Sequence, residues 1–168
     1  MDDTQKKNKI CMLGAFAVGK TSLVARFVKS IFSEKYHTTV GVKIDKKTVA
    51  VNGQTVHLIL WDLAGEDEFL QVRMSYMRGT SGYLLVADGT RPETLAKAVE
   101  LKTRCDNEIG AVPFILVLNK ADLVDEWRIA DSQLLEYVEK GWTIFQTSAK
   151  SGQYVEEVFS VLAGKILA

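Results

Sequence analysis

The first residues with chemical potential lie in the stretch LGAFAVGKTSL, residues 13–23. Gly14, four further residues and then Gly19-Lys20-Thr21 fit the phosphate-binding pattern G-x-x-x-x-G-K-[ST]. In such a loop the backbone N–H groups form an anion-binding concavity, and the N-terminus of the next helix adds positive potential. The Lys20 ammonium would reach the β- and γ-phosphates, and the Thr21 hydroxyl would ligate Mg²⁺. The alternative is a glycine-bearing turn without a ligand. The predicted phosphate-binding residues are Gly14, Ala17, Val18, Gly19, Lys20, Thr21 and Ser22.

A second motif, LILWDLAGED at residues 58–67, begins as an apolar strand and ends in polar residues. The Asp62 carboxylate can hold the Mg²⁺ shell, through water. Gly65 has no Cβ, so its N–H can approach a γ-phosphate. The D-x-x-G pattern is common by chance, and its place after a strand and a phosphate loop gives it weight.

A third motif, LVLNKADL at residues 116–123, places Asn119, Lys120 and Asp122 at the end of another apolar strand. The Asp122 carboxylate can accept hydrogen bonds from N1–H and the exocyclic amine of guanine. Adenine cannot offer that pair of donors and would leave the carboxylate unpaired. The Lys120 stem can lie along the base or ribose. A solvated loop is the alternative.

A fourth motif is TSAKSG, residues 147–152. The Ala149 N–H is predicted to donate to guanine O6, while Ser148 and Lys150 brace the loop. Taken alone, the segment is equally well explained as a turn between a strand and a helix.

The elements that must position these motifs alternate between strand and helix patterns. Asn52-Gly53 between two apolar runs predicts a hairpin, hence one antiparallel pair. Thr90-Arg-Pro-Glu93 predicts a capping box with proline in the first helical turn. The predicted strands are Lys9–Leu13, Lys43–Val51, Thr55–Asp62, Gly82–Ala87, Pro113–Asn119 and Thr143–Thr147. The predicted helices are Lys20–Ser30, Glu68–Tyr76, Arg91–Glu108, Ser132–Glu139 and Tyr154–Leu167.

This alternation predicts an α/β fold with a mostly parallel sheet between two layers of helices. Ligands of such sheets bind at the carboxyl ends of the strands, where all four motifs fall.

Composition sets limits on function. The 168 residues suit one domain, residues 1–168, with residues 1–8 as a flexible extension. The 21 basic and 21 acidic side chains balance, so bulk binding to nucleic acid or an anionic membrane is not expected. Cys11 and Cys105 are read as buried or incidental thiols of a reduced compartment rather than a disulfide. The chain shows no secretory signal, membrane span or lipidation motif, so we expect a cytoplasmic protein without a direct membrane anchor in this chain. A lipidated C-terminal tail outside this sequence is the alternative.

The four motifs, in this order and at these intervals, resemble those of a Ras-superfamily small GTPase of the Rab and Ras branches. The resemblance extends from Ile10 to the final helix. It implies a three-layer G domain with six strands and five helices that binds GTP or GDP with Mg²⁺. It also implies that effectors and regulators, namely exchange factors and activating proteins, bind through two switch segments.

The resemblance adds residues in the stretch FSEKYHTTVGVKI, residues 32–44. Thr39 matches the threonine that ligates Mg²⁺ and contacts the γ-phosphate in the GTP state. Phe32 matches the aromatic that packs against guanine, with a core anchor as the alternative. Tyr36 matches the tyrosine that closes over the phosphates, with a surface tyrosine as the alternative. Trp61 matches a tryptophan that faces effectors in Rab-like members.

Two residues depart from the family pattern. Phe16 replaces a usual glycine, and Glu66 replaces the glutamine that orients the attacking water. Glu66 would bring negative charge toward the γ-phosphate and cannot donate to the transition state. We therefore expect nucleotide binding with slow hydrolysis, the catalytic residues being Lys20, Thr39, Gly65 and Glu66. The alternatives are a rearranged site in which Glu66 faces solvent, and a catalytically impaired interaction module. An adenine-specific ATPase or kinase conflicts with the third motif.

Overall fold

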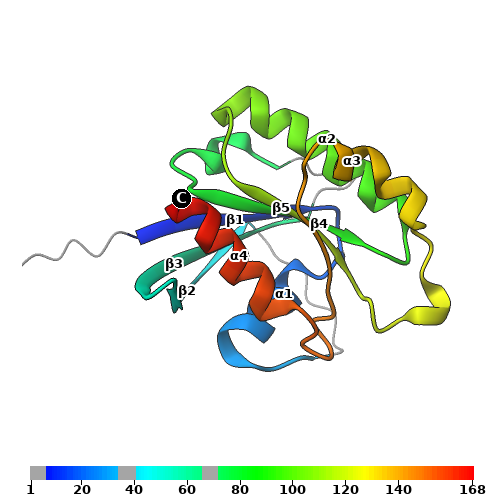
Figure 1. The fold of residues 1–168 in the computed structure, drawn as a ribbon, viewed down its shortest axis with the longest axis horizontal. Helices are drawn as coiled ribbons and strands as arrows, with labels where there is room; N and C mark the ends of the chain where they lie inside the picture. The colour runs from blue at the N-terminus through cyan, green and yellow to red at the C-terminus, as the bar shows by residue number, and fades with distance from the viewer. Residues whose placement is uncertain (1–6, 34–40, 66–71) are drawn as a thin grey trace, which may run out of the picture.

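The computed structural model describes residues 7–33, 41–65 and 72–168, and its centre is a single β-sheet (Figure 1). The predictions for Tyr36, Thr39 and Glu66 lie outside the described residues. The sheet has six strands in the order β2-β3-β1-β4-β5-β6. The strands are β1 Lys7–Gly14, β2 Val42–Val51, β3 Gln54–Leu63, β4 Gly82–Asp88, β5 Phe114–Asn119 and β6 Ile144–Gln146.

The pairing of the strands confirms the predicted topology. β1 pairs in parallel with both β3 and β4, and β5 pairs in parallel with both β4 and β6. β2 and β3 are antiparallel, joined at Asn52 and Gly53 with φ values of 50° and 77°. Both residues of this turn need the left-handed conformation that asparagine and glycine tolerate best. β1 begins at Lys7, two residues before the predicted start.

The helices cover both faces of the sheet, with α1 and α4 on one side and α2 and α3 on the other (Figure 1). The structure describes four α-helices: α1 Lys20–Lys29, α2 Pro92–Ile109, α3 Leu135–Glu139 and α4 Val155–Leu167. Short 3₁₀ helices occupy Met74–Met77, Val124–Glu126 and Asp131–Leu134. Among these described helices, none is long and apolar enough to cross a bilayer.

The expected count of five helices is therefore corrected. Of the predicted helix Glu68–Tyr76, the described end forms a 3₁₀ turn in which the Tyr76 N–H donates to the Arg73 carbonyl at 3.0 Å. The predicted helix Ser132–Glu139 is 3₁₀ in its first half, because the Gln133 N–H donates to the Ala130 carbonyl three residues back. Hydrogen bonds between residues i and i+3 tighten both segments.

The predicted capping box at the start of α2 is also wrong. The helix begins at Pro92, and no side chain caps it. The Thr90 hydroxyl donates instead to Oδ1 of Asp88, at 2.7 Å. The buried carboxylate of Asp88 thus competes successfully for the group that the local pattern assigned to the helix. Proline in the first turn is confirmed.

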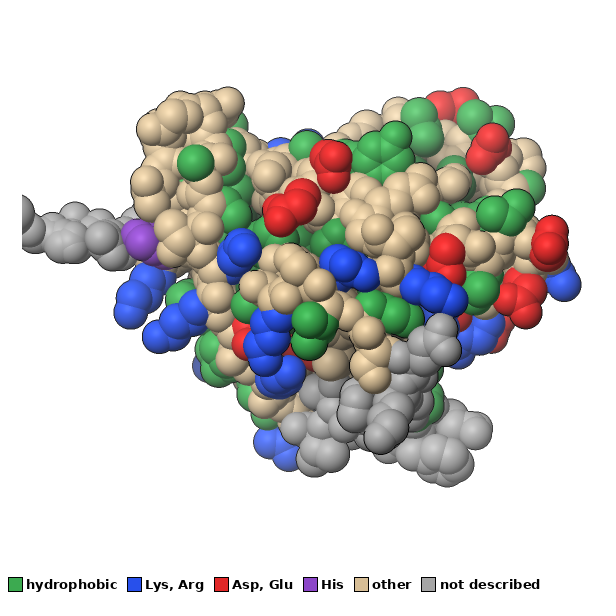
Figure 2. Space-filling model, turned by 90° about the horizontal axis from the view of Figure 1, so that it is seen from below, with side chains coloured by type: hydrophobic (Ala, Val, Ile, Leu, Met, Phe, Trp, Pro, Cys, Tyr) green, Lys and Arg blue, Asp and Glu red, His purple; other side chains and the backbone are tan. Residues whose placement is uncertain are grey.

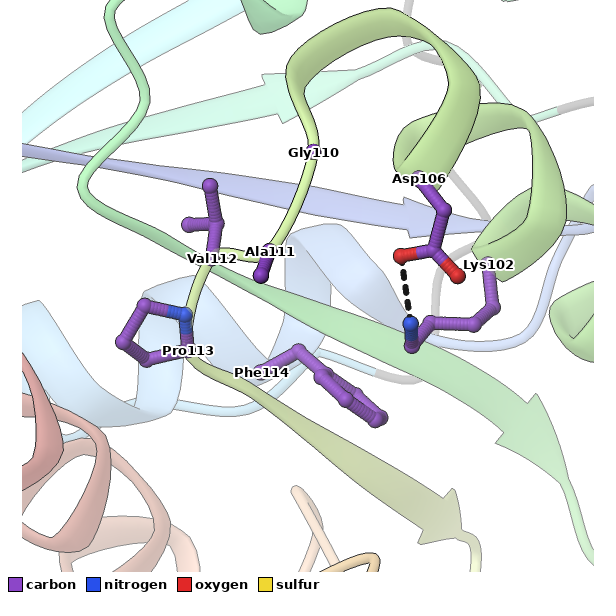
Figure 3. Close-up of a pocket in the computed structure, with 7 residues that line it drawn as sticks. All are labelled: Lys102, Asp106, Gly110, Ala111, Val112, Pro113 and Phe114. Carbon is purple, nitrogen blue, oxygen red and sulfur yellow. Dashed lines mark hydrogen bonds and ion pairs between the residues drawn. The ribbon is translucent and has the colours of Figure 1, made fainter.

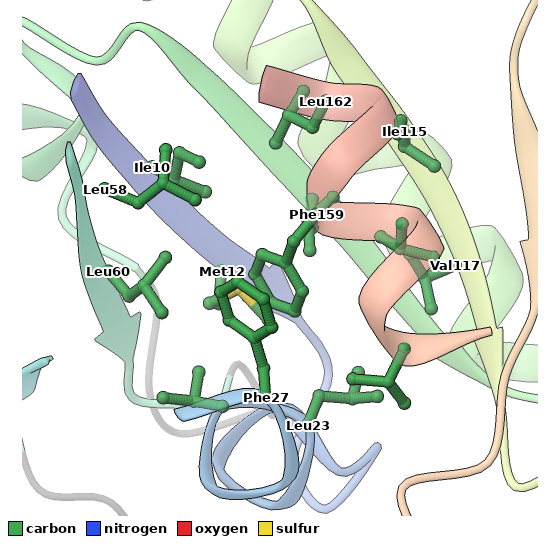
Figure 4. Packing of buried hydrophobic residues seen from close by; sticks show 14 of the residues in the cluster. Ile10, Met12, Leu23, Phe27, Leu58, Leu60, Ile115, Val117, Phe159 and Leu162 are labelled. Carbon is green, nitrogen blue, oxygen red and sulfur yellow. The ribbon is translucent and has the colours of Figure 1, made fainter. Parts of the chain in front are cut away.

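The core consists of two apolar clusters, one on each face of the sheet. Ile10 and Met12 of β1 point to the α1/α4 face, while Cys11 and Leu13 belong to the cluster under α2. Alternate residues of a strand point to opposite faces, so a strand covered on both faces is apolar throughout. Figure 4 shows the α1/α4 face, where the rings of Phe27 and Phe159 stack with centroids 3.9 Å apart.

Both cysteines are buried and free, as the sequence predicted. Burial raises the pKa of the Cys105 thiol to about 12 and also raises the pKa of Cys11. Both side chains are therefore neutral packing groups at physiological pH.

Candidate functional site

The phosphate loop connects β1 to α1 at the carboxyl edge of the sheet. Ala17 and Gly19 have φ values of 64° and 102°, which curl the backbone into a concave turn. A Cβ on Gly19 would lie 2.2 Å from Nδ2 of Asn119, and one on Gly14 would lie 2.4 Å from the Val86 carbonyl oxygen. Both glycines are therefore required for close packing of the loop against the ends of neighbouring strands.

The phosphate loop and the start of α1 also position Val18 and Ser22, two further residues of the predicted phosphate site. Val18 is fully buried in the α1/α4 cluster and anchors the loop to the core. Ser22 lies in the first turn of α1, directly after Thr21. The helix thus begins at the loop, and its N-terminal end provides positive potential there.

Lys20 is the first residue of α1 and is almost fully buried. Its ammonium donates to the carbonyl oxygens of Gly14 and Ala15, at 3.5 and 3.3 Å. Burial lowers its pKa to about 8, although the nearby Asp62 carboxylate acts in the opposite direction. The described part of the site therefore contains a desolvated cation that an anion above the loop would stabilise.

The Thr21 hydroxyl donates to Oδ2 of Asp62, at 2.5 Å. Asp62 is 1% exposed, and its other carboxylate oxygen has no hydrogen-bond partner among the described residues. Burial raises the pKa of this carboxyl, because desolvation disfavours its ionised form. A hydroxyl oxygen beside an unpaired buried carboxylate oxygen is suited to a hard cation such as Mg²⁺. The pair predicted to bind metal is therefore assembled, and its chemistry fits.

Gly65, two residues after β3, lies directly against the phosphate loop. A Cβ at this position would be 2.6 Å from Cα of Phe16 and 3.0 Å from the Ala15 carbonyl oxygen. This close approach explains why the residue is glycine. It also brings the end of the second motif into contact with the first.

Phe16 leaves a large part of its side chain in solvent, with 38% of the residue exposed. Its carbonyl oxygen accepts a hydrogen bond of 2.7 Å from Nη2 of Arg91, at the start of α2. Because the concave turn is formed by backbone, the aromatic side chain does not prevent its formation.

The third and fourth motifs meet through Asn119. Its Nδ2 donates to the Val18 carbonyl at 3.1 Å, and its Oδ1 accepts from the Thr147 hydroxyl at 3.1 Å and the Ala149 N–H at 3.3 Å. One buried amide therefore ties β5, the phosphate loop and the loop after β6 together. The predicted donation from Ala149 to guanine O6 stays a prediction.

Lys120 and Asp122 complete the third motif. The Lys120 ammonium donates to the Ala17 carbonyl at 3.1 Å and pairs with Asp88 at 2.9 Å. Oδ1 of Asp122 accepts from the Ser148 hydroxyl at 2.8 Å. The Asp122 carboxylate, predicted to recognise guanine, is therefore oriented by the fourth motif, which was predicted to lie beside it.

The remaining predicted residues lie around this group. Lys150 is exposed, and its carbonyl accepts from the Arg26 guanidinium, which also donates to the Ala149 carbonyl at 2.8 Å. Phe32 is partly buried against the α1/α4 cluster, which matches the core-anchor alternative and leaves its base contact a prediction. Sequence reasoning did not assign a role to Arg26.

Sequence reasoning also assigned no role at the site to Asp88 or Arg91. Asp88 ends β4 at the same edge as the other motifs, so the rule that ligand-site residues follow parallel strands would have identified it. No comparable local signal marked Arg91, since its partner Phe16 is 75 residues away in the chain.

Trp61, predicted to face effectors, is partly buried against the cluster under α2, and the Lys9 ammonium lies 3.7 Å from its ring centroid. Its contact with effectors stays a prediction. A pocket of about 580 Å³ lies at the amino end of β5 (Figure 3), where Lys102 pairs with Asp106 at 2.5 Å and lies over the Phe114 ring. The face in Figure 2 carries both basic and acidic side chains.

Three features lie at one edge of a mostly parallel sheet: a phosphate loop, a buried Thr–Asp pair and the sequence Asn-Lys-x-Asp at the end of a strand. Together they define a P-loop nucleotide-binding protein of the G-domain class. The Ras family model matches residues 9–168, and the chain belongs to this family. It is similar to Ras-related protein Rab-13 of Canis lupus familiaris and of Bos taurus, each 34% identical over 95% of this chain and 79% of the relative. Rab-13 of Mesocricetus auratus is 33% identical over the same shares. The chain is thus a Rab-like small GTPase.

Proposed function

We propose that this chain binds GTP and GDP with Mg²⁺, hydrolyses GTP slowly and acts as a molecular switch, with residues 1–168 as a single G domain. The observation that carries the proposal is the buried Lys20 ammonium, which among described residues donates to the Gly14 and Ala15 carbonyls. The Asp62 carboxylate offsets only part of the cost of burying this charge, and phosphate oxygens would offset more of it.

The preference for guanine is supported by the placement of Asp122. Ser148 holds one of its oxygens, and the carboxylate can accept from the N1–H and amine of guanine. Adenine would leave these charged acceptors unpaired, which costs about 1–3 kcal/mol per group. Asn119, Ala149 and Lys150 support the same loop.

Thr21 and Asp62 would hold Mg²⁺, and Thr39 is the third proposed ligand. When bound, Mg²⁺ would neutralise charge on the β- and γ-phosphate oxygens. The N–H of Gly65 and Thr39 would contact the γ-phosphate in the GTP form alone. Loss of these contacts on hydrolysis would release both switch segments, which effectors, exchange factors and activating proteins would distinguish.

Hydrolysis is proposed to be slow for two reasons. Glu66 cannot donate a hydrogen bond to the γ-phosphate oxygens, and its charge opposes theirs. Phe16 is exposed beside the place where an arginine of an activating protein would enter. In this class of enzymes such an arginine contributes roughly 10³–10⁵ in rate.

A single-turnover assay with GTP and Mg²⁺ tests this proposal. We expect a wild-type rate below about 10⁻⁴ s⁻¹, the order of magnitude of an unassisted small GTPase. The double variant Phe16→Gly, Glu66→Gln should be faster. An unchanged rate in a variant that still binds GTP would contradict the steric and charge argument. Complete absence of turnover in both would indicate an interaction module instead.

A further inference from the structure

Asp88 is the centre of a charged cluster behind the phosphate loop. It ends β4 and is 1% exposed. Oδ1 accepts from the Thr90 N–H and hydroxyl, at 2.8 and 2.7 Å. Oδ2 accepts from Nε of Arg91 at 3.1 Å and lies 2.9 Å from Nζ of Lys120. One buried carboxylate therefore orients two cations from different parts of the chain.

Both cations extend from this carboxylate to the phosphate loop. Nη2 of Arg91 donates to the Phe16 carbonyl at 2.7 Å, and Nζ of Lys120 donates to the Ala17 carbonyl at 3.1 Å. These carbonyls are consecutive. The loop is thus held from outside at two neighbouring peptide groups.

Because the peptide bond is planar, a contact that fixes a carbonyl group also fixes the N–H of the following residue. In a trans peptide the C=O and N–H point in opposite directions. Fixing the Phe16 carbonyl toward Arg91 turns the Ala17 N–H the other way, and fixing the Ala17 carbonyl does the same for the Val18 N–H. These are two of the N–H groups that a phosphate-binding loop presents to its anion.

The same contacts offset backbone strain. Ala17 has φ 64°, a conformation that costs an L-residue other than glycine about 1–2 kcal/mol. Hydrogen bonds to charged donors are stronger than neutral ones and can hold the residue there. Their positive charge also increases the potential at the anion site.

We propose that Arg91 and Asp88 are positioning residues for nucleotide phosphates, acting through the Phe16 and Ala17 carbonyls on the N–H groups of Ala17 and Val18. This inference rests on the proposed nucleotide binding. Neither residue touches the nucleotide. Their contribution is to retention of the phosphates and not to recognition of the base.

The test measures dissociation of fluorescently labelled GDP from Arg91→Ala, Arg91→Lys and Asp88→Asn proteins. Arg128→Ala is the matched control, because this exposed guanidinium donates to carbonyls of its own loop. We expect Arg91→Ala to release GDP about 10- to 100-fold faster, the range for a lost charged hydrogen bond. Arg91→Lys should be intermediate because it retains the charge, Asp88→Asn should also release GDP faster, and the control should match wild type.

A second measurement distinguishes the positioning of the phosphate loop from a general loss of structure in the nucleotide site. The ratio of GDP to ADP affinity reports base recognition and should be unchanged in Arg91→Ala. A release rate within twofold of the control, or a loss of base preference as large as the loss of affinity, would overturn the inference. If Arg91→Ala does not fold, the inference is tested on Arg91→Lys and Asp88→Asn. The same two quantities are measured, the GDP release rate and the ratio of GDP to ADP affinity. Failure of wild type to bind GDP would instead contradict the proposed function itself.

Discussion

The hydroxyl of Thr21 and the carboxylate of Asp62 form a hydrogen bond of 2.5 Å between the first turn of α1 and the end of β3. The second carboxylate oxygen is buried and has no hydrogen-bond partner among the described residues. Two motifs 41 residues apart in the chain therefore meet through the two oxygen-bearing side chains that are proposed to hold Mg²⁺.

Replacing Asp62 by asparagine separates its role in metal binding from its role in stability. GDP release should become at least about tenfold less sensitive to Mg²⁺, since a charged ligand is lost. The nucleotide-free protein should lose no stability in urea, because burial disfavours the ionised carboxylate that the variant removes. A Mg²⁺ titration of the release rate measures the first effect. Wild-type Mg²⁺ dependence in the variant would show that Asp62 does not serve the metal.

Gly19→Ala should destabilise the protein by about 2 kcal/mol or more and abolish tight nucleotide binding. The new Cβ would lie 2.2 Å from Nδ2 of Asn119, and clashes of this kind typically cost about 1–3 kcal/mol in addition to backbone strain. Gly141→Ala is the control, because this residue has φ 85° and no atom within 4 Å of the added Cβ. Chemical denaturation compares them. Equal losses in the two variants would mean that strain, and not contact with Asn119, explains the effect.

Asp122→Ala should reduce GTP affinity about 10- to 100-fold and leave the weaker ATP affinity unchanged. The reason is that the carboxylate is proposed to pair with groups that only guanine carries. Calorimetry with each nucleotide measures both values. Ser148→Ala is the control, because it removes a group that orients Asp122 and should have a smaller effect. A parallel loss of GTP and ATP affinity would contradict base recognition by this residue.

Acid should weaken the stabilising contribution of Asp88. Burial raises the pKa of this carboxyl, but hydrogen bonds from Thr90, Lys120 and Arg91 outweigh it and leave the pKa below its usual value. The contribution is therefore complete above about pH 4, the unfolded value, and is lost as the pH falls through the lower folded value. The difference in unfolding free energy between wild type and Asp88→Asn should therefore shrink as the pH falls below about 4. A difference that does not vary with pH would show that the charge of Asp88 does not stabilise the fold.

The sequence predicted the residues whose positions depend on local pattern. Asp62 and Asn119 lie at the ends of apolar strands, and Lys20 begins the helix that follows another. Parallel strands bring such residues to one edge of the sheet. The cap of α2 was predicted wrongly because the Thr90 hydroxyl has a competing partner two residues earlier, the Asp88 carboxylate, which the sheet buries. The contact of Arg91 with Phe16 likewise depends on tertiary packing, which periodicity does not encode.

The central claim is that this site binds guanine nucleotides through their base and phosphates together. Calorimetry of the purified, nucleotide-free protein with GTP, GDP and ATP in the presence of Mg²⁺ tests it most directly. We predict that GTP and GDP bind at least about 100-fold more tightly than ATP, as expected for two hydrogen bonds to a charged acceptor. Equal affinity for GTP and ATP, or no binding of either, would contradict the claim.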